Sequence, residues 1–292
     1  MKPRTLPKLS KFYIDDVIKT ALTEDVNYID VTTDLLPELG DCDGRVKATL
    51  TAKEDGVIAG IDIALRVFEL LDRSCNCKPL FRDGQTVKLG DVIAEISGEA
   101  TAVLKGERTA LNLLQHMSGI ATYTNKCVLE ATKSGTKCQI SDTRKTLPGL
   151  RALQKYSVLC GGGSNHRYNL SQAVMLKDNH IDAFGSISNA IKTVRERTGH
   201  TIVVEVEIRD LEQLTQALDA KADIIMLDNM NVSEMRTAVK IANAHSHTAK
   251  LEASGNVTLE NIAEVASTGI DIISIGALTH SVRAFDISLR LI

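Results

Sequence analysis

The chain has 292 residues, which allows one large domain or two smaller ones. Hydrophobic residues make up 43% and charged residues 24%, as in an ordinary globular protein, and the formal charge of −3 excludes a global basic field for nucleic acid or a membrane surface. We expect a cytoplasmic protein, because the first ten residues lack the apolar segment of a signal peptide and no apolar run approaches the roughly 20 residues of a membrane span.

The first part of the chain has the mixed pattern of an α+β domain. Apolar residues at helical spacing predict helices at residues 11–23 and 61–71. A long helical stretch, from residue 106 to about residue 132, is expected to connect two domains. Short strands with turn residues between them are expected at 46–51, 56–59, 86–89 and 92–96.

From residue 136 onward, short apolar strands alternate with amphipathic helices. The expected strands are 136–140, 173–177, 202–207, 223–227, 249–253 and 271–275. The expected helices are 186–198, 211–219, 233–244 and 259–267. This alternation predicts βαβ units and a parallel sheet, and it leaves open whether the sheet is doubly wound or closed into a barrel.

Each predicted strand of the second half is followed by charged residues, serine or glycine. These residues are Asp142 to Lys145, Lys177, Glu207, Asp228, Ser254 with Gly255, and Gly276. The carboxyl ends of parallel strands carry the active site both in a barrel and in an open α/β sheet. The sequence therefore predicts a site at this edge, whichever architecture forms.

Cationic side chains dominate the predicted site. They are Arg144, Lys145 and Lys177, with His166 and Arg167 from a loop after three glycines and with Arg108 and Arg151 as further candidates. Such a cluster repels itself unless its ligand brings several negative charges. Glu207 and Asp228 supply the oxygen ligands that Mg²⁺ prefers, and the glycines let backbone N–H groups approach a phosphate. These residues indicate a Mg²⁺-dependent enzyme that acts on a phosphorylated, multiply anionic substrate.

Two further positions have open interpretations. Glu205 lies two residues before Glu207, on the same strand face, and is a candidate for a deeper, buried ion-pair partner. His280 either lines the site or packs against it. The six cysteines have no framework spacing and are expected to be free thiols, and Cys75 with Cys77 lacks the second pair that a zinc site needs.

Seven motifs, in order along the chain, resemble the quinolinate phosphoribosyltransferase family. They are GERTALN at 106–112, DTRKTLPGLR at 142–151, GGGSNHR at 161–167, KDNH at 177–180, VEVE at 204–207, LDN at 227–229 and EASG at 252–255. The resemblance covers nearly the whole chain. It implies an N-terminal α+β open sandwich at residues 1–115, joined by the C-terminal segment 281–292, and a C-terminal, TIM-like α/β barrel of seven strands at residues 116–280.

The resemblance also implies roles for individual residues. Substrate contacts fall on Thr143, Arg144, Lys145, His166, Arg167, Lys177, Glu207 and Asp228, with Arg108 reaching into the neighbouring active site of a homodimer. Among these, the residues matching catalytic groups are Lys145, Lys177, Glu207 and Asp228. The phosphate-binding loops match Ser254, Gly255, Asn256, Ser274, Ile275 and Gly276. Asn256 stands where many members have a second glycine, so the backbone path of that loop is in doubt.

The implied reaction converts quinolinate and 5-phosphoribosyl 1-pyrophosphate into nicotinate mononucleotide, CO2 and pyrophosphate, with Mg²⁺, in de novo NAD biosynthesis. Two alternatives have different consequences. A pyridine phosphoribosyltransferase or related pyrophosphorylase on the same scaffold would release no CO2. A catalytically silent phosphate-binding barrel would bind the donor without turnover.

Overall fold

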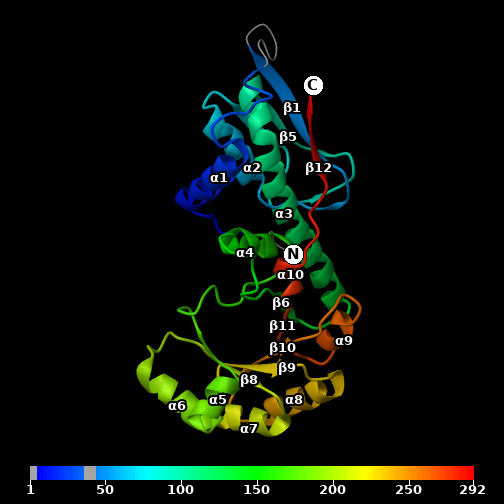
Figure 1. Cartoon of the computed structure of the whole chain (residues 1–292). Coiled ribbons are helices and arrows are strands. Elements are labelled where there is room, and N and C mark those ends of the chain that lie inside the picture. Colours follow the sequence, from blue (N-terminus) through cyan, green and yellow to red (C-terminus); the bar gives the residue numbers. More distant parts are fainter. Residues whose placement is uncertain (1–4, 36–43) are drawn as a thin grey trace. The chain divides into compact units, whose positions relative to one another are not determined.

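The computed structural model describes residues 5–35 and 44–292, which form two compact units (Figure 1). The first unit contains the described residues up to Asn125 together with Thr146–Gly162 and Leu278–Ile292. The second contains Lys126–Lys145 and Gly163–Ala277. Two later segments therefore return to the first unit, and one of them, Thr146–Gly162, was expected in the barrel.

The first unit is built on a four-stranded antiparallel sheet of order β12-β1-β5-β3. Its strands are β1 (Arg45–Ala52), β3 (Asn76–Pro79), β5 (Val92–Glu99) and β12 (Ile287–Leu291). A small second sheet pairs β2 (Gly56–Val57) with β4 (Thr86–Val87). The outer strand β12 comes from the far end of the sequence and pairs with β1 in the register Ala52↔Ile287 (Figure 1). Neither β3 nor β12 was predicted as a strand.

Helices α1 (Lys11–Val26), α2 (Ile61–Leu71) and α4 (Arg151–Cys160) belong to this unit, and the short α10 (Ala277–His280) lies at its boundary. The apolar core includes Ile18 of α1, Phe68 of α2 and Leu50 of β1, all fully buried. The core therefore joins helices and sheet through aliphatic side chains and few aromatic ones, as the 3% aromatic content requires.

Helix α3 (Ala100–Thr132) begins six residues before the predicted start at Gly106. Glycine at this position suggested a boundary, but it lies inside the helix. A Cβ atom on Gly106 would lie 2.9 Å from Cδ1 of Phe68, so the glycine serves close packing against α2.

The second unit contains six parallel strands in the order β6-β11-β10-β9-β8-β7. They are β6 (Gln139–Ser141), β7 (Val174–Leu176), β8 (Val204–Ile208), β9 (Ile224–Asp228), β10 (Lys250–Ser254) and β11 (Ile272–Ser274). All six predicted strands are confirmed, with ends that differ by a few residues. Each strand is followed along the chain by helical residues, as βαβ units require.

The resemblance implied a seventh strand, and the sheet has six. In its place, Ser164 makes a single parallel bridge to Ser141 on the open edge of β6. The bridge does not extend into a strand: the next residues bind the Asp142 carboxylate, through the His166 backbone amide and the Asn165 side chain.

Helices α5 (Asp178–Phe184), α6 (Ile187–Arg197), α7 (Leu211–Asp219), α8 (Val232–Ala244) and α9 (Ile262–Ala266) belong to the same unit. Figure 1 shows α6, α7 and α8 along one side of β8 and β9. Their starts are fixed by side-chain caps: Ser186 accepts from the Asn189 amide, Asp210 from Gln213, and Asn231 from Glu234. In the described part of the chain, no helix combines the length and apolar character needed to cross a membrane.

Candidate active site

Alternate residues of the parallel strands face one cavity of about 430 Å³ in the second unit. In register, Met175 lies beside Glu205, and Glu207 beside Met226. Because side chains alternate along a strand, Glu207, Asp228 and Ser254 project from the same face near their strand ends. The residues that line the cavity are Thr143, Arg144, Lys145, His166, Arg167, Met175, Lys177, Glu207, Met226, Asp228, Ser254 and Ser274.

The guanidinium of Arg167 is held by two uncharged groups. Its Nη1 donates to the Ala173 carbonyl at 3.0 Å, and Nη2 lies 3.5 Å from the sulfur of Met175. Among the described residues it forms no ion pair with a carboxylate. Burial, and then the neighbouring Arg144 guanidinium, lower the pKa of Arg167. A ligand anion would relieve both effects, so Arg167 is prepared to bind one.

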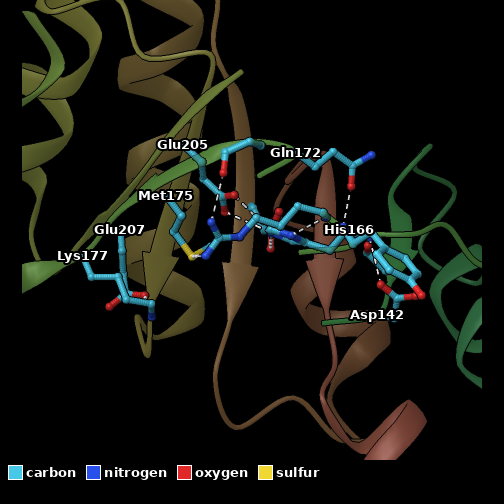
Figure 2. Close-up of polar contacts among 12 residues, drawn as sticks. Asp142, His166, Gln172, Met175, Lys177, Glu205 and Glu207 are labelled. Carbon is cyan, nitrogen blue, oxygen red and sulfur yellow. Dashed lines mark hydrogen bonds and ion pairs between the residues drawn. The ribbon is translucent and has the colours of Figure 1, made fainter. Parts of the chain in front are cut away.

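Asp142 fixes the loop that carries Arg167. This carboxylate is fully buried, accepts the His166 amide at 2.9 Å and accepts Asn165 Nδ2 at 2.6 Å (Figure 2). The Arg167 amide in turn donates to His166 Nδ1 at 2.7 Å. Hydrogen bonds through the Asp142 and His166 side chains therefore connect the end of β6 to Arg167, which lines the cavity.

Lys177 and Glu207 come from neighbouring strand ends and form an ion pair, with 2.6 Å between Nζ and Oε2 (Figure 2). The next residue, Asp178, pairs with Arg209. The backbone amide of Asn179 and then Arg209 lower the pKa of Asp178. Of these two pairs, Lys177 with Glu207 lines the cavity, whereas Asp178 with Arg209 lies outside its lining.

Two buried carboxylates, Glu205 and Glu252, lie next to His166. His166 Nε2 is 3.1 Å from Glu205 Oε2 and 3.5 Å from Glu252 Oε1. Ligand atoms of the three residues all lie within 4.8 Å of one another. The predicted deeper role of Glu205 as a buried ion-pair partner agrees with this geometry. Sequence reasoning missed Glu252, although a glutamate between Leu251 and Ala253 on an apolar strand was an available signal.

The turn after β10 is tied to the turn after β9. Asn256 Nδ2 donates to Asn229 Oδ1 at 3.1 Å, and the Asn229 amide donates to the Ser254 carbonyl at 2.9 Å. Asn229 Nδ2 lies 3.1 Å from Asp228 Oδ2. Both asparagines have positive φ, 53° for Asn229 and 54° for Asn256. Asn256 thus adopts the left-handed conformation that glycine would supply, which answers the doubt about the backbone path.

Not every predicted residue lines the cavity. Ile275 is buried, and its amide already donates to the Ser141 carbonyl at 2.9 Å, so this N–H is not available to a phosphate. Gly255, Asn256 and Gly276 flank Ser254 and Ser274 without lining the cavity themselves. Arg108, Arg151 and His280 belong to the first unit. Conversely, Met175 and Met226 line the cavity and were not predicted, since an apolar residue inside a strand gives no such signal.

The donor set fits a hard divalent cation. Glu207 and Asp228 both line the cavity, and carboxylate oxygens are the ligands that Mg²⁺ prefers.

Comparisons with known proteins agree with this arrangement. The family model of the quinolinate phosphoribosyl transferase N-terminal domain matches residues 30–118, and that of the C-terminal domain matches residues 120–290. The probable nicotinate-nucleotide pyrophosphorylase [carboxylating] of Synechocystis is 42% identical over 279 residues, which is 96% of this chain and 92% of that protein. The nicotinate-nucleotide pyrophosphorylase [carboxylating] of Mycobacterium leprae is 44% identical over 94% of this chain and 96% of its own.

Solved structures give the same result. The nicotinate-nucleotide pyrophosphorylase from Francisella tularensis superposes with a TM-score of 0.92 at 37% identity, over 100% of both chains. Family models covering both units, close relatives and a shared fold lead to one conclusion: the chain belongs to the quinolinate phosphoribosyl transferase family.

Proposed function

We propose that the protein is a decarboxylating quinolinate phosphoribosyltransferase of de novo NAD biosynthesis. It takes quinolinate and 5-phosphoribosyl 1-pyrophosphate to nicotinate mononucleotide, CO2 and pyrophosphate. The observation that carries the proposal is the cavity itself, which is lined by Arg144, Lys145, His166, Arg167 and Lys177 together with the carboxylates Glu207 and Asp228. Such a lining suits a dianionic acid beside a phosphorylated sugar.

The chemistry begins at the ribose. The pyridine nitrogen attacks C1 of the donor, the bond from C1 to pyrophosphate breaks, and positive charge develops at C1 as the leaving group departs. We assign Glu207 and Asp228 to the side of the cavity that receives the ribose, where their negative charge stabilises this carbon. Lys145 and Lys177 then face the developing charge on the pyrophosphate and the ring carboxylates.

The second step breaks the bond between the ring and its 2-carboxylate. The electron pair of that bond moves toward the pyridinium nitrogen, CO2 leaves, and C2 of the ring takes up a proton. Arg144, Arg167 and Lys177, with His166, hold the ring carboxylates during both steps, and fixed orientation is the main contribution that such contacts make. No covalent intermediate with the protein is needed.

Mg²⁺ is the proposed cofactor, held by Glu207 and Asp228 together with donor oxygens. When bound there, it would stabilise the negative charge of the leaving pyrophosphate. Ser254, Gly255, Asn256, Ser274, Ile275 and Gly276 are the proposed 5-phosphate loops, and for Ile275 the contribution is backbone shape.

We also propose a homodimer in which Arg108 of each subunit reaches the neighbouring active site, and a cytoplasmic location. Arg108 is exposed, as a residue that contacts another subunit would be in an isolated chain. The described cysteines, Cys75, Cys77, Cys127, Cys138 and Cys160, are all free thiols, which suits a reducing compartment. Cys42 lies outside the described residues.

One assay tests the function. Purified protein with Mg²⁺, the donor and quinolinate labelled in the 2-carboxylate should form nicotinate mononucleotide and release labelled CO2 in equal amounts. Product without CO2 from a monocarboxylate substrate would favour the non-decarboxylating alternative. Donor binding with no turnover of either acid would favour the silent barrel.

A further inference from the structure

Glu205 and Glu252 form a buried pair that does not itself line the cavity. They lie on β8 and β10, the two strands on either side of β9, and each is only 1% exposed. Of the residues near them, His166 both contacts this pair and lines the cavity. Two carboxylates without solvent are costly to bury, and a buried ion pair is weak support for stability. Function therefore explains the buried pair better than stability does. His166 connects the pair to the cavity, because it contacts both glutamates and lines the cavity.

The hydrogen bonds around His166 define its tautomer. The Arg167 backbone N–H can only donate, so His166 Nδ1, 2.7 Å away, is the acceptor and carries no proton. The ring proton is then on Nε2, which points at Glu205 Oε2 at 3.1 Å. The Glu205 carboxylate accepts a hydrogen bond from the proton on Nε2. This contact favours the Nε2–H tautomer over the Nδ1–H tautomer.

Glu252 completes the cluster, and its carboxyl group gains or loses a proton near neutral pH. Burial, and next the Glu205 carboxylate, raise the pKa of Glu252 to about 7, while His166 acts in the opposite direction. Its Oε1 makes no hydrogen bond and lies 3.5 Å from His166 Nε2. Its strand neighbours, Met226 of β9 and Ile272 of β11, do not titrate, and the Ser274 hydroxyl acts in the same direction as His166.

We propose, resting on the proposed function, that Glu205 and Glu252 are positioning residues that act on the dicarboxylate substrate through His166 and Arg167. The pair fixes the ring as the Nε2–H tautomer, Nδ1 then anchors the Arg167 amide, and the Arg167 guanidinium stays at the cavity wall to bind a ring carboxylate. Glu252 keeps the buried charge at one negative unit below neutral pH. When Glu252 loses its proton, a second buried negative charge opposes the incoming dianion.

Steady-state kinetics with full-length variants test this inference. Glu205→Gln introduces an amide donor that can face Nε2 and permits the other tautomer, so we expect the KM for quinolinate to rise at least tenfold with the KM for the donor unchanged. Glu252→Gln mimics the protonated acid. We expect the quinolinate KM of the parent to rise above pH 7, and we expect this variant to match the parent at pH 6.5 and to lack that rise. Glu264→Gln, an exposed glutamate on α9, is the matched control and should behave as the parent throughout.

Two further measurements separate positioning from general support of the fold. In a double-mutant cycle, Glu205→Gln should add nothing to the loss caused by His166→Asn, whereas independent structural damage would add. Nitrogen-15 NMR of the histidine rings should show one protonated and one unprotonated nitrogen for His166, a pattern lost in Glu205→Gln. The His166→Asn spectrum identifies the signal.

The outcomes are distinguishable from failure of the proposed function. If the parent protein does not turn over quinolinate, the function itself is wrong. If the parent is active and both Gln variants keep its quinolinate KM and pH profile, the positioning role is wrong. Stoichiometric metal in the dialysed parent that is lost in both variants would also overturn it, since the cluster would then be a metal site.

Discussion

Arg167 shows how a single residue is made ready for an anion. Its guanidinium contacts a carbonyl oxygen and a thioether, and burial together with Arg144 lowers its pKa. Lys177 differs, because Glu207 already compensates its charge in the absence of ligand. At the residue scale, the cavity therefore combines Arg167, which has no carboxylate partner among the described residues, with Lys177, which must exchange Glu207 for a ligand.

Removing these cations should impair catalysis while the fold persists. We expect Arg144→Ala, Arg167→Ala and Lys177→Ala each to reduce turnover of quinolinate by orders of magnitude, since losing a charged contact to a ligand typically costs about 2–5 kcal/mol. Lys240→Ala, an exposed change on α8, is the charge-matched control. Steady-state assays alongside thermal unfolding measure both effects. Near-normal turnover in all three variants would contradict the site assignment.

Glu252 makes the stability of the protein depend on pH. Its pKa is raised from 4.5 to about 7 in the folded state, so between these values the folded state binds more protons than the unfolded state. The free energy of unfolding then falls as pH rises through this window, by up to about 3 kcal/mol. Urea unfolding at pH 5 and pH 8 should show this fall in the parent and a smaller one in Glu252→Gln. An equal fall in both proteins would argue against a buried, protonated Glu252.

At the element scale, the turns after β9 and β10 are joined by hydrogen bonds of Asn229 to Asn256 and to Ser254, and together they form a clasp. Gly255 has φ of +95°, and a Cβ atom there would lie 2.1 Å from Asn229 Oδ1. A side chain at this position must therefore displace Asn229, which also contacts Asp228. The clasp links the proposed phosphate loop to the proposed ribose carboxylate.

Gly255→Ala should open this clasp. We expect a higher KM for the phosphorylated donor, with quinolinate binding retained, because backbone strain of about 1–3 kcal/mol falls on the loop. Gly199→Ala is the control, since a Cβ there meets no atom within 4 Å. Binding of each substrate by calorimetry gives the comparison. Equal donor affinity in the two variants would show that the loop does not receive the donor.

The elements themselves were largely predictable, for local reasons. Helices α2 and α7 have the bounds that helical periodicity predicted, because apolar faces and, for α7, the Asp210 cap are encoded within the segment. Helix α4 was missed. Its buried residues include the polar Gln154, Lys155 and Ser157, so its buried face is not marked by apolar residues alone. Ten of the predicted site residues line one cavity, because most of them lie at or just after predicted strand ends. Glu252 lies inside β10, and its proximity to Glu205 depends on the pairing of strands that are distant in the sequence.

At the scale of the whole molecule, the two units interleave along the chain; the resemblance implied the return of segment 281–292, whereas residues 146–162 were expected in the barrel. Residues 146–162 and 278–292 return to the first unit after the second has begun. Pairing between β1 and β12 joins residues about 240 positions apart, and no local pattern specifies such a partner. A strand of five residues with a weak apolar pattern gives little local signal.

Ile287 is the residue that ties β12 to the core. It is 3% exposed, whereas Leu291 on the same strand is 49% exposed. Ile287→Ala should therefore lower the free energy of unfolding by about 2–5 kcal/mol, as for other buried aliphatic truncations. Leu291→Ala should change it by less than about 0.5 kcal/mol. Denaturant unfolding of the pair measures the difference, and equal effects would show that β12 is not integrated into the first unit.

The position of β12 has a consequence for how the chain is made. During synthesis, every residue of the second unit leaves the ribosome before Phe285 and Ile287, which complete the core of the first unit. Domains commonly fold in the order of their emergence, with the N-terminal one first. Here the order is inverted: the catalytic cavity can form on the nascent chain, while the unit that was translated first waits, with the edge of β1 uncovered, for the last strand to arrive.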